Sequence, residues 1–170
     1  MSDDNVYVRG LKNVAACQTR ISFVDPLGAL YYSGYDIDRL IGRVCFEEVV
    51  HLLLYKKLPN KSELDNIRST LISEMKLPKQ IVTYIKHSHK NSHPMETMRT
   101  TISLLGEYDP NRADTSETVN KQRALKLIAK VPTIVASLYR IRNKQTYSRL
   151  IKNTGLLKTF FTCFEVSSQM

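Results

Sequence analysis

The strongest constraint on the fold is the spacing of apolar residues after position 36. Phe46, Val49, Val50, Leu53 and Leu54 recur at intervals of three and four, which places them on one face of a helix. The same spacing returns in several later segments. We therefore predict a mainly α, helical fold, with helices from residue 36 on, over about 36–41, 46–58, 62–75, 78–85, 93–106 and 116–139.

Polar and breaking residues set the expected helix boundaries. Ser62 is a candidate N-cap, Pro78 suits a first helical turn, and Gly106 is an end signal. Pro132 lies inside the last helical pattern, and we expect it to kink or divide that helix because it removes an amide donor. In the 93–106 helix the expected buried residues are Met95, Met98, Ile102 and Leu105.

The only strand patterns precede the helices. Short β-prone runs at 14–24 and 29–32 flank an Asp-Pro-Leu-Gly turn at 25–28, which predicts a small β-hairpin over about 14–32. Residues 145–170 differ in character, since they have no acidic residue before Glu165 and carry a Phe-rich cluster at 160–164. We expect an atypical tail there, which a genuine terminus, a truncation, a frameshift or a gene-model error would each explain.

Charge and cysteine content limit the partners and the cellular compartment that we expect. The net charge of +9 raises nucleic acid, anionic lipid or phosphate-bearing small molecules as partners, but the cations alternate with apolar helix positions, which favours solvated helix faces. Cys17, Cys45 and Cys163 are odd in number and share no metal-site spacing. With no run near about 18 apolar residues and no signal-peptide pattern, we expect a cytoplasmic protein without a membrane span.

A search for chemistry assigns no catalytic, cofactor-binding or metal-binding residue. His87, His89 and His93 are close in sequence, but 87 and 89 point to opposite sides of a helix, which favours solvated or capping roles over a metal site. His51 reads as a partly buried helix residue. Cys17 and Cys45 have no histidine at a catalytic spacing, and no glycine-rich phosphate loop is present.

A nucleic-acid interface is also disfavoured. Residues 76–90 hold Tyr84 among lysines and histidines, which loosely matches a basic and aromatic surface. Tyr84, however, belongs to the apolar stripe of Ile81 and Ile85, so core packing is the better interpretation.

Four motifs in order resemble the citrate synthase family. They span residues 9–144 and begin with an opening segment that ends in LYYSGYDI at 30–37. The others are FEEVVHLLLYKKLP at 46–59, HPMETMRTTIS at 93–103 and LIAKVPTI at 127–134. Ser33 stands where the family usually has Arg, and Lys56 where glycine is common. These motifs do not separate citrate from 2-methylcitrate synthases.

The resemblance implies an acyltransferase sequence of the tricarboxylic acid cycle. The family condenses acetyl-CoA, a substrate rather than a bound cofactor, with oxaloacetate, using two histidines and an aspartate. No position here matches the motifs of those residues, and we do not assign His93 as a catalytic histidine. We therefore expect residues 1–144 to form the N-terminal portion of the family's large domain and the isolated chain to be inactive.

The resemblance also implies a partner. In the family the helices after His-Pro-Met and around Val-Pro-Thr pack against their counterparts across a dimer. Residues 94–106 and 118–140 are thus interface candidates for a homodimer or for pairing with a full-length homologue. A helical interaction module is the alternative function, and a basic nucleic-acid binder is a remoter one.

Overall fold

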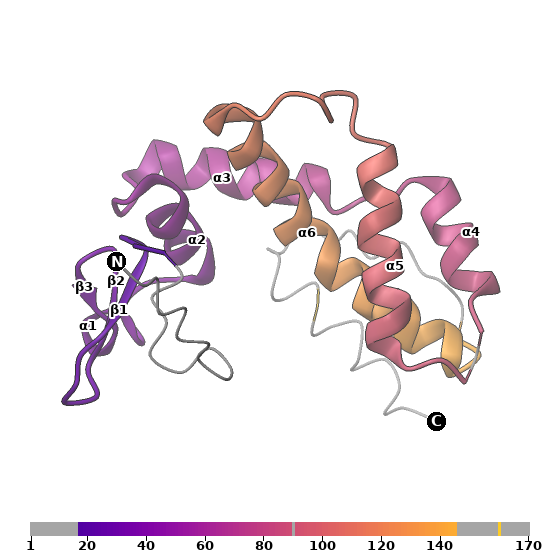
Figure 1. Cartoon of the computed structure of the whole chain (residues 1–170), viewed down its shortest axis with the longest axis horizontal. Helices are drawn as coiled ribbons and strands as arrows, with labels where there is room; N and C mark the ends of the chain where they lie inside the picture. The colour runs from indigo at the N-terminus through magenta and orange to yellow at the C-terminus, as the bar shows by residue number, and fades with distance from the viewer. Residues whose placement is uncertain (1–16, 90, 146–159, 161–170) are drawn as a thin grey trace, which may run out of the picture.

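The protein is mainly helical, with one small sheet at the N-terminal side (Figure 1). The computed structural model describes residues 17–89, 91–145 and 160; the start of the expected hairpin, at 14–16, and nearly all of the tail at 145–170 lie outside them. The described chain runs through three short strands and six helices, which confirms the predicted mainly α class.

The predicted hairpin is present between β1 (Ser22–Val24) and β2 (Leu30–Tyr32), which pair antiparallel with Phe23 opposite Tyr31. The Asp-Pro-Leu-Gly segment forms its turn, because the Gly28 amide donates to the Asp25 carbonyl at 2.8 Å. Gly28 has a φ of 95°, a conformation that favours glycine.

A third strand, β3 (Tyr35–Asp36), was not predicted. It follows β2 through a two-residue turn in which Ser33 and Gly34 have φ values of 48° and 87°. Two positive φ angles are typical of the tight hairpin turn whose twist matches that of the strands. The sheet order is β1-β2-β3.

The first helices begin close to the expected positions. Helix α1 (Ile37–Leu40) follows Asp36, whose carboxylate accepts from the Asp38 amide, and α2 (Phe46–Tyr55) ends at Lys56. Helix α3 (Lys61–Glu74) begins two residues after Pro59, and its N-cap is Asn60 rather than Ser62. The Asn60 side chain accepts from the Glu63 amide while Glu63 accepts from the Asn60 amide, both at 2.9 Å, so two unpaired donors are satisfied reciprocally.

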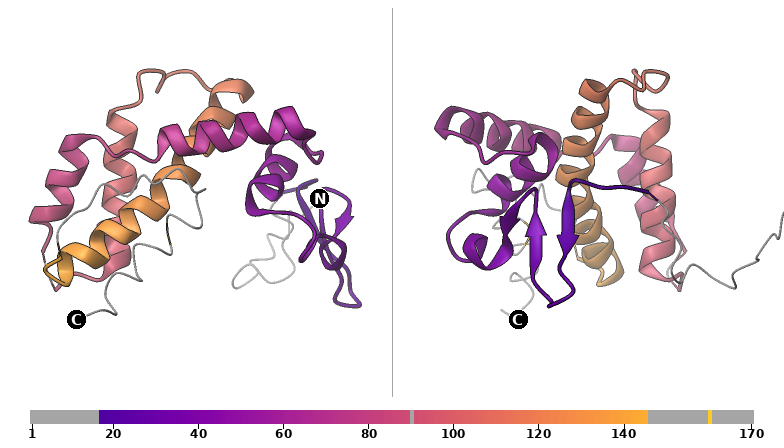
Figure 2. Two further views of the ribbon diagram at one scale, coloured as in Figure 1. Left: turned by 180° about the vertical axis from the view of Figure 1, so that it is seen from behind. Right: turned by 60° about the vertical axis from the view of Figure 1, so that its left-hand side comes forward.

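Helices α4 (Lys79–His87) and α5 (Pro94–Glu107) form an antiparallel pair on the opposite side of the molecule from the sheet (Figure 2). The expected burial of Met95 is wrong, since 57% of this residue is exposed. The buried positions of α5 are Thr97 and Thr101, and Gly106 lies inside the helix instead of ending it. Met98, Ile102 and Leu105 are partly buried, as expected for the same face.

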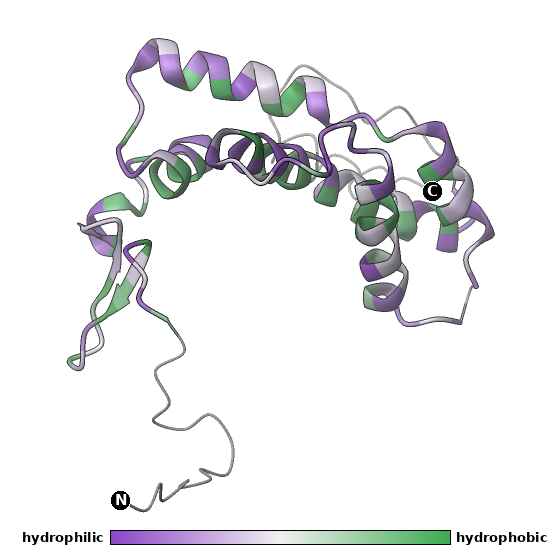
Figure 3. Ribbon diagram, turned by 45° about the horizontal axis from the view of Figure 1, so that its top comes forward, coloured by the Kyte–Doolittle hydropathy of each residue, from purple (hydrophilic) through white to green (hydrophobic). Residues whose placement is uncertain are grey.

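Pro132 was expected to kink or divide its helix; α6 (Glu117–Arg142) is continuous through Pro132, so the helix is not divided there (Figure 1). It packs along both halves of the helical body and contacts α3, α4 and α5. Leu125 and Ala129 belong to one apolar cluster, with residues of α2 and α3; Ile134 and Leu138 belong to a second, with residues of α4. One long helix thus joins two cores. Figure 3 shows that hydrophobic and hydrophilic residues are interspersed along the helices.

Candidate functional site

The predicted interface helices meet along an apolar groove. It has a volume of about 280 Å³ and lies between the start of α5 and the last turns of α6. Met95 and Tyr139 stand on it with 57% and 38% exposure, while Leu138 is buried beneath. The groove is lined by Pro94, Met95, Met98, Val135, Leu138, Tyr139, Arg142 and Asn143.

Polar contacts fix the start of α5 against the end of α6. Arg142 donates from Nη2 to the Ser92 carbonyl at 2.7 Å, and the Ser92 hydroxyl lies 3.0 Å from that of Thr97. The Arg142–Ser92 bond joins residues 50 positions apart in the chain. Arg142 and Asn143 also line the groove, although they lie beyond the predicted interface range 118–140. That range follows the family motif, whereas helix α6 continues to Arg142.

His93 caps α5, one of the roles expected of it. Its Nδ1 accepts from the Met95 amide at 3.2 Å, and its own amide donates to Glu96 Oε2 at 3.0 Å. His87 Nδ1 lies 2.8 Å from the Thr83 carbonyl, and His89 Nδ1 accepts from the Asn91 amide at 3.3 Å. Within the part of the chain that the structure describes, no group of histidines, cysteines and carboxylates is placed to hold a metal ion.

His51 and Tyr84 also match their predicted structural roles. His51 is 5% exposed, its Nδ1 lies 2.8 Å from the Lys57 carbonyl, and its ring stacks on Tyr55. Tyr84 packs on the second core cluster with Ile81 and Ile85. His51 is thus hydrogen-bonded at the end of α2, and Tyr84 packs with the apolar stripe of α4.

Cys45 shows no sign of an activated nucleophile. It precedes α2, and burial raises the pKa of its thiol, the reverse of what a reactive thiolate needs. Its Sγ accepts a hydrogen bond from Arg68 Nη2 at 3.4 Å.

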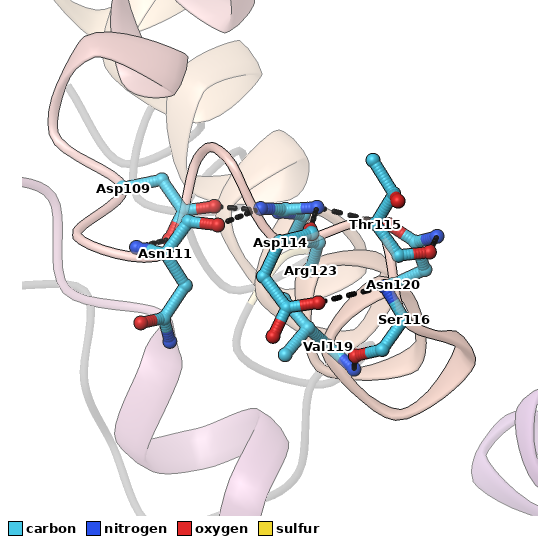
Figure 4. Close-up of polar contacts among 8 residues, drawn as sticks. All are labelled: Asp109, Asn111, Asp114, Thr115, Ser116, Val119, Asn120 and Arg123. Atoms are coloured by element: carbon cyan, nitrogen blue, oxygen red, sulfur yellow. Dashed lines mark hydrogen bonds and ion pairs between the residues drawn. The ribbon is translucent and has the colours of Figure 1, made fainter.

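Arg123 is a polar centre that the sequence search missed (Figure 4). From α6 its Nε donates to Asp109 Oδ2 at 2.6 Å and its Nη1 to the Asp114 carbonyl at 2.6 Å, while Nη2 donates to the Asn111 carbonyl. The guanidinium holds the pKa of Asp109 below its usual range. These contacts order the loop between α5 and α6, and its partners 9 to 14 residues away gave no sequence signal.

Comparison with known proteins decides the family. The model described as "Citrate synthase, C-terminal domain" matches residues 10–169. This chain belongs to the citrate synthase family. It is 41% identical over 135 residues to "Citrate synthase 2" of Bacillus subtilis (strain 168), covering 79% of this chain and 36% of that protein. It is 35% identical over 146 residues to "Citrate/2-methylcitrate synthase" of the same organism, covering 85% of this chain and 39% of that protein.

Solved citrate synthases share the fold. The crystal structure of citrate synthase from Pyrobaculum aerophilum superposes with a TM-score of 0.83 at 30% identity, over 90% of this chain and 40% of that one. The chain therefore spans well under half the length of the relatives that it matches. No helix in the described residues is both long enough and apolar enough to cross a membrane.

Proposed function

We propose that this chain is a citrate-synthase-type acyltransferase sequence that does not turn over substrate on its own. The observation that carries the proposal is its coverage of 36% to 40% of its relatives, with no position matching the motifs of the family's catalytic residues. Residues 1–144 would then supply the N-terminal part of a large domain. The family reaction joins acetyl-CoA to oxaloacetate and releases coenzyme A.

The test is an assay for acetyl-CoA consumption in the presence of oxaloacetate. The assay should follow loss of the thioester directly rather than detect released coenzyme A with a thiol reagent. The exposed Cys17 would also react with such a reagent and raise the background. We expect no rate above the blank, with a full-length citrate synthase as the positive control. Turnover that co-purifies with the chain, and persists when it is made in a host lacking citrate synthase, would refute the proposal.

We further propose that the groove between α5 and α6 is an association surface, for a second copy of this chain or for a full-length homologue. Exposed Met95 beside Tyr139 supports this, since an apolar groove rimmed by polar residues is typical of an interface. The odd number of cysteines supports a cytoplasmic setting, which fractionation would test.

Light scattering after size-exclusion chromatography tests the association surface. Met95→Glu should shift the chain towards monomer, because it places a charge in the groove. Leu27→Glu is the matched control, since Leu27 is 96% exposed in the hairpin turn, far from the groove. A chain that is monomeric and does not co-purify with a full-length enzyme would exclude this role.

A further inference from the structure

Helix α4 carries exposed cations along its outer side. Lys79, Thr83 and Lys86 recur at intervals of four and three, so they lie along one face of the helix, and Lys76 precedes the helix. All four residues are exposed. Figures 1 and 2 place α4 at the end of the molecule farthest from the sheet. We call Lys76, Lys79 and Lys86 the lysine face of α4.

No acidic side chain neutralises the lysine face. No aspartate or glutamate lies between Glu74 and Glu96 in the sequence. The three lysine ion pairs of the described chain lie elsewhere, with nitrogen–oxygen distances of 2.6 to 2.8 Å. The lysine face makes no side-chain hydrogen bond or ion pair with the residues that the structure describes. Its three positive charges are therefore uncompensated, which favours an anionic partner.

The stability of α4 does not explain these charges. The amide end of a helix carries partial positive charge, so a cation there is unfavourable. Lys79 is nevertheless the first residue of α4, and Lys76 lies just before it. The other five described helices each have an acidic residue in their first turn, whereas α4 has none and no side chain caps it. The cations at this end therefore oppose helix stability, which points to a role in binding.

The opposite side of α4 holds the lysine face in place. Ile81 and Ile85 are buried in the second core cluster, and Val82 and Tyr84 pack against it. No apolar residue of α4 is exposed, so none is free to enter a bilayer. Tyr84 is packed and residues 75–91 contain no arginine, so the face lacks the groups that stack on bases or grip phosphates in pairs. A second copy would bring the same cations to this face and repel it.

We propose that the lysine face of α4 binds an acidic helix of a partner protein, with carboxylates repeated at intervals of three and four. An ammonium group is a point charge that a single carboxylate satisfies. Lys79 and Lys86 stand two helical turns apart, a rise of about 10 Å, which carboxylates at the same intervals on a second helix match. This assignment is independent of the proposed acyltransferase identity and of the α5–α6 groove.

The experiment titrates the ¹⁵N-labelled chain at low salt with a helical peptide of about 16 residues, which carries glutamates at intervals of three and four in an alanine background. We expect amide shifts confined to residues 76–89, and an affinity that falls as salt is raised. Shifts spread evenly over the protein would overturn the proposal. So would tighter binding of a DNA duplex or of phosphatidylserine vesicles through the same residues, because the partner would then be of another class.

A double variant locates the surface. Lys76→Glu with Lys79→Glu should weaken peptide binding by at least about tenfold. The same change should not lower the urea midpoint, because it places acids at the amide end of α4. Lys56→Glu with Lys61→Glu is the control, since both lysines are exposed at the end of α2 and the start of α3 and the change in net charge is equal. Equal weakening by the two double variants would mean diffuse attraction to a +9 chain and would refute the surface.

A charge swap tests the pairing itself. A peptide with lysines in place of its glutamates should not bind the parent chain but should bind the Lys76→Glu, Lys79→Glu variant. That variant still has a net charge of +5, because each substitution removes two positive charges from +9. Diffuse attraction therefore predicts no binding of the lysine peptide. If the folded variant, checked by thermal unfolding, fails to bind this peptide at residues 76–89, the assignment is overturned.

Discussion

Lys130 on α6 closes the last turn of α3 by donating to both the carboxylate and the backbone carbonyl of Glu74, each at 2.7 Å. The Lys130 side chain is 12% exposed, so this pair is shielded far more than the other lysine pairs in the described chain. It links residues 56 apart and ties the long helix to the helix that it crosses.

Lys130→Gln should therefore destabilise the protein. Loss of the ammonium leaves the Glu74 carboxylate without its partner and a helix-end carbonyl without a donor, which costs about 1–3 kcal/mol. Urea unfolding followed by circular dichroism measures it. Lys121→Gln is the matched control on the same helix, because its partner Glu117 is 79% exposed, and it should barely move the midpoint. Equal shifts in the two variants would contradict this account.

Arg123→Lys should loosen the loop between α5 and α6. A lysine keeps the charge opposite Asp109 but lacks the planar fork that also reaches the carbonyls of Asn111 and Asp114. Hydrogen exchange in residues 108–116 should become roughly tenfold faster, while exchange in α4 stays unchanged. Exchange that rises equally throughout the protein would indicate global destabilisation instead.

Acid should weaken the same loop. Arg123 chiefly, with the Asn111 amide, holds the pKa of Asp109 below its usual value of 3.8. A carboxyl with a depressed folded-state pKa contributes stability that is complete above its unfolded value and is lost as pH falls through its folded value. Asp114, whose pKa is lowered by hydrogen bonds from Ser116, acts in the same direction.

The urea midpoint should therefore drop as pH falls below about 4. Asp109→Asn should begin less stable at neutral pH, because it removes the ion pair with Arg123, and should then fall less steeply in acid. A slope in acid identical to that of the parent protein would assign the transition to other carboxylates.

The helices could be predicted because their signals are local. The apolar spacing at Phe46, Val49 and Leu53 predicts helix α2, but the residues that α2 buries are Val50, His51 and Leu52, and Phe46 is 37% exposed. The Asn60–Glu63 capping box can also be read from the sequence, where Ser62 is the predicted N-cap. Met95 was misplaced because α5 buries Thr97 and Thr101, which look polar in sequence. The Thr101 hydroxyl donates to the Thr97 carbonyl at 2.7 Å, so its burial leaves no polar group unpaired.

The candidate sites were harder to predict, because they depend on distant pairs. Lys130 with Glu74, and Arg142 with Ser92, are at least 50 residues apart, and no local pattern marks them. The family motifs indicated which helices form the α5–α6 groove.

Lys56→Gly should stabilise the protein. Lys56 ends α2 with a φ of 62°, a left-handed conformation that costs a side chain about 1–2 kcal/mol and glycine almost nothing. After the greater flexibility of unfolded glycine is subtracted, a gain of about 0.5–1 kcal/mol remains. The family's usual glycine at this position fits that geometry. Lys86→Gly, inside α4, is the control and should lose about 1 kcal/mol; a loss at both positions would contradict the prediction.

Thr133→Val should also stabilise the protein, for a different reason. Thr133 is 5% exposed, and its hydroxyl has no hydrogen-bond partner among the described residues. Valine has nearly the same shape and removes a buried polar group that lacks a partner, which is worth about 1 kcal/mol. Thr101→Val is the matched control, because the Thr101 hydroxyl is buried and bonded to the Thr97 carbonyl. It should be neutral or destabilising in thermal unfolding. A loss of stability in Thr133→Val as well would contradict the assignment of this hydroxyl as an unpaired buried group.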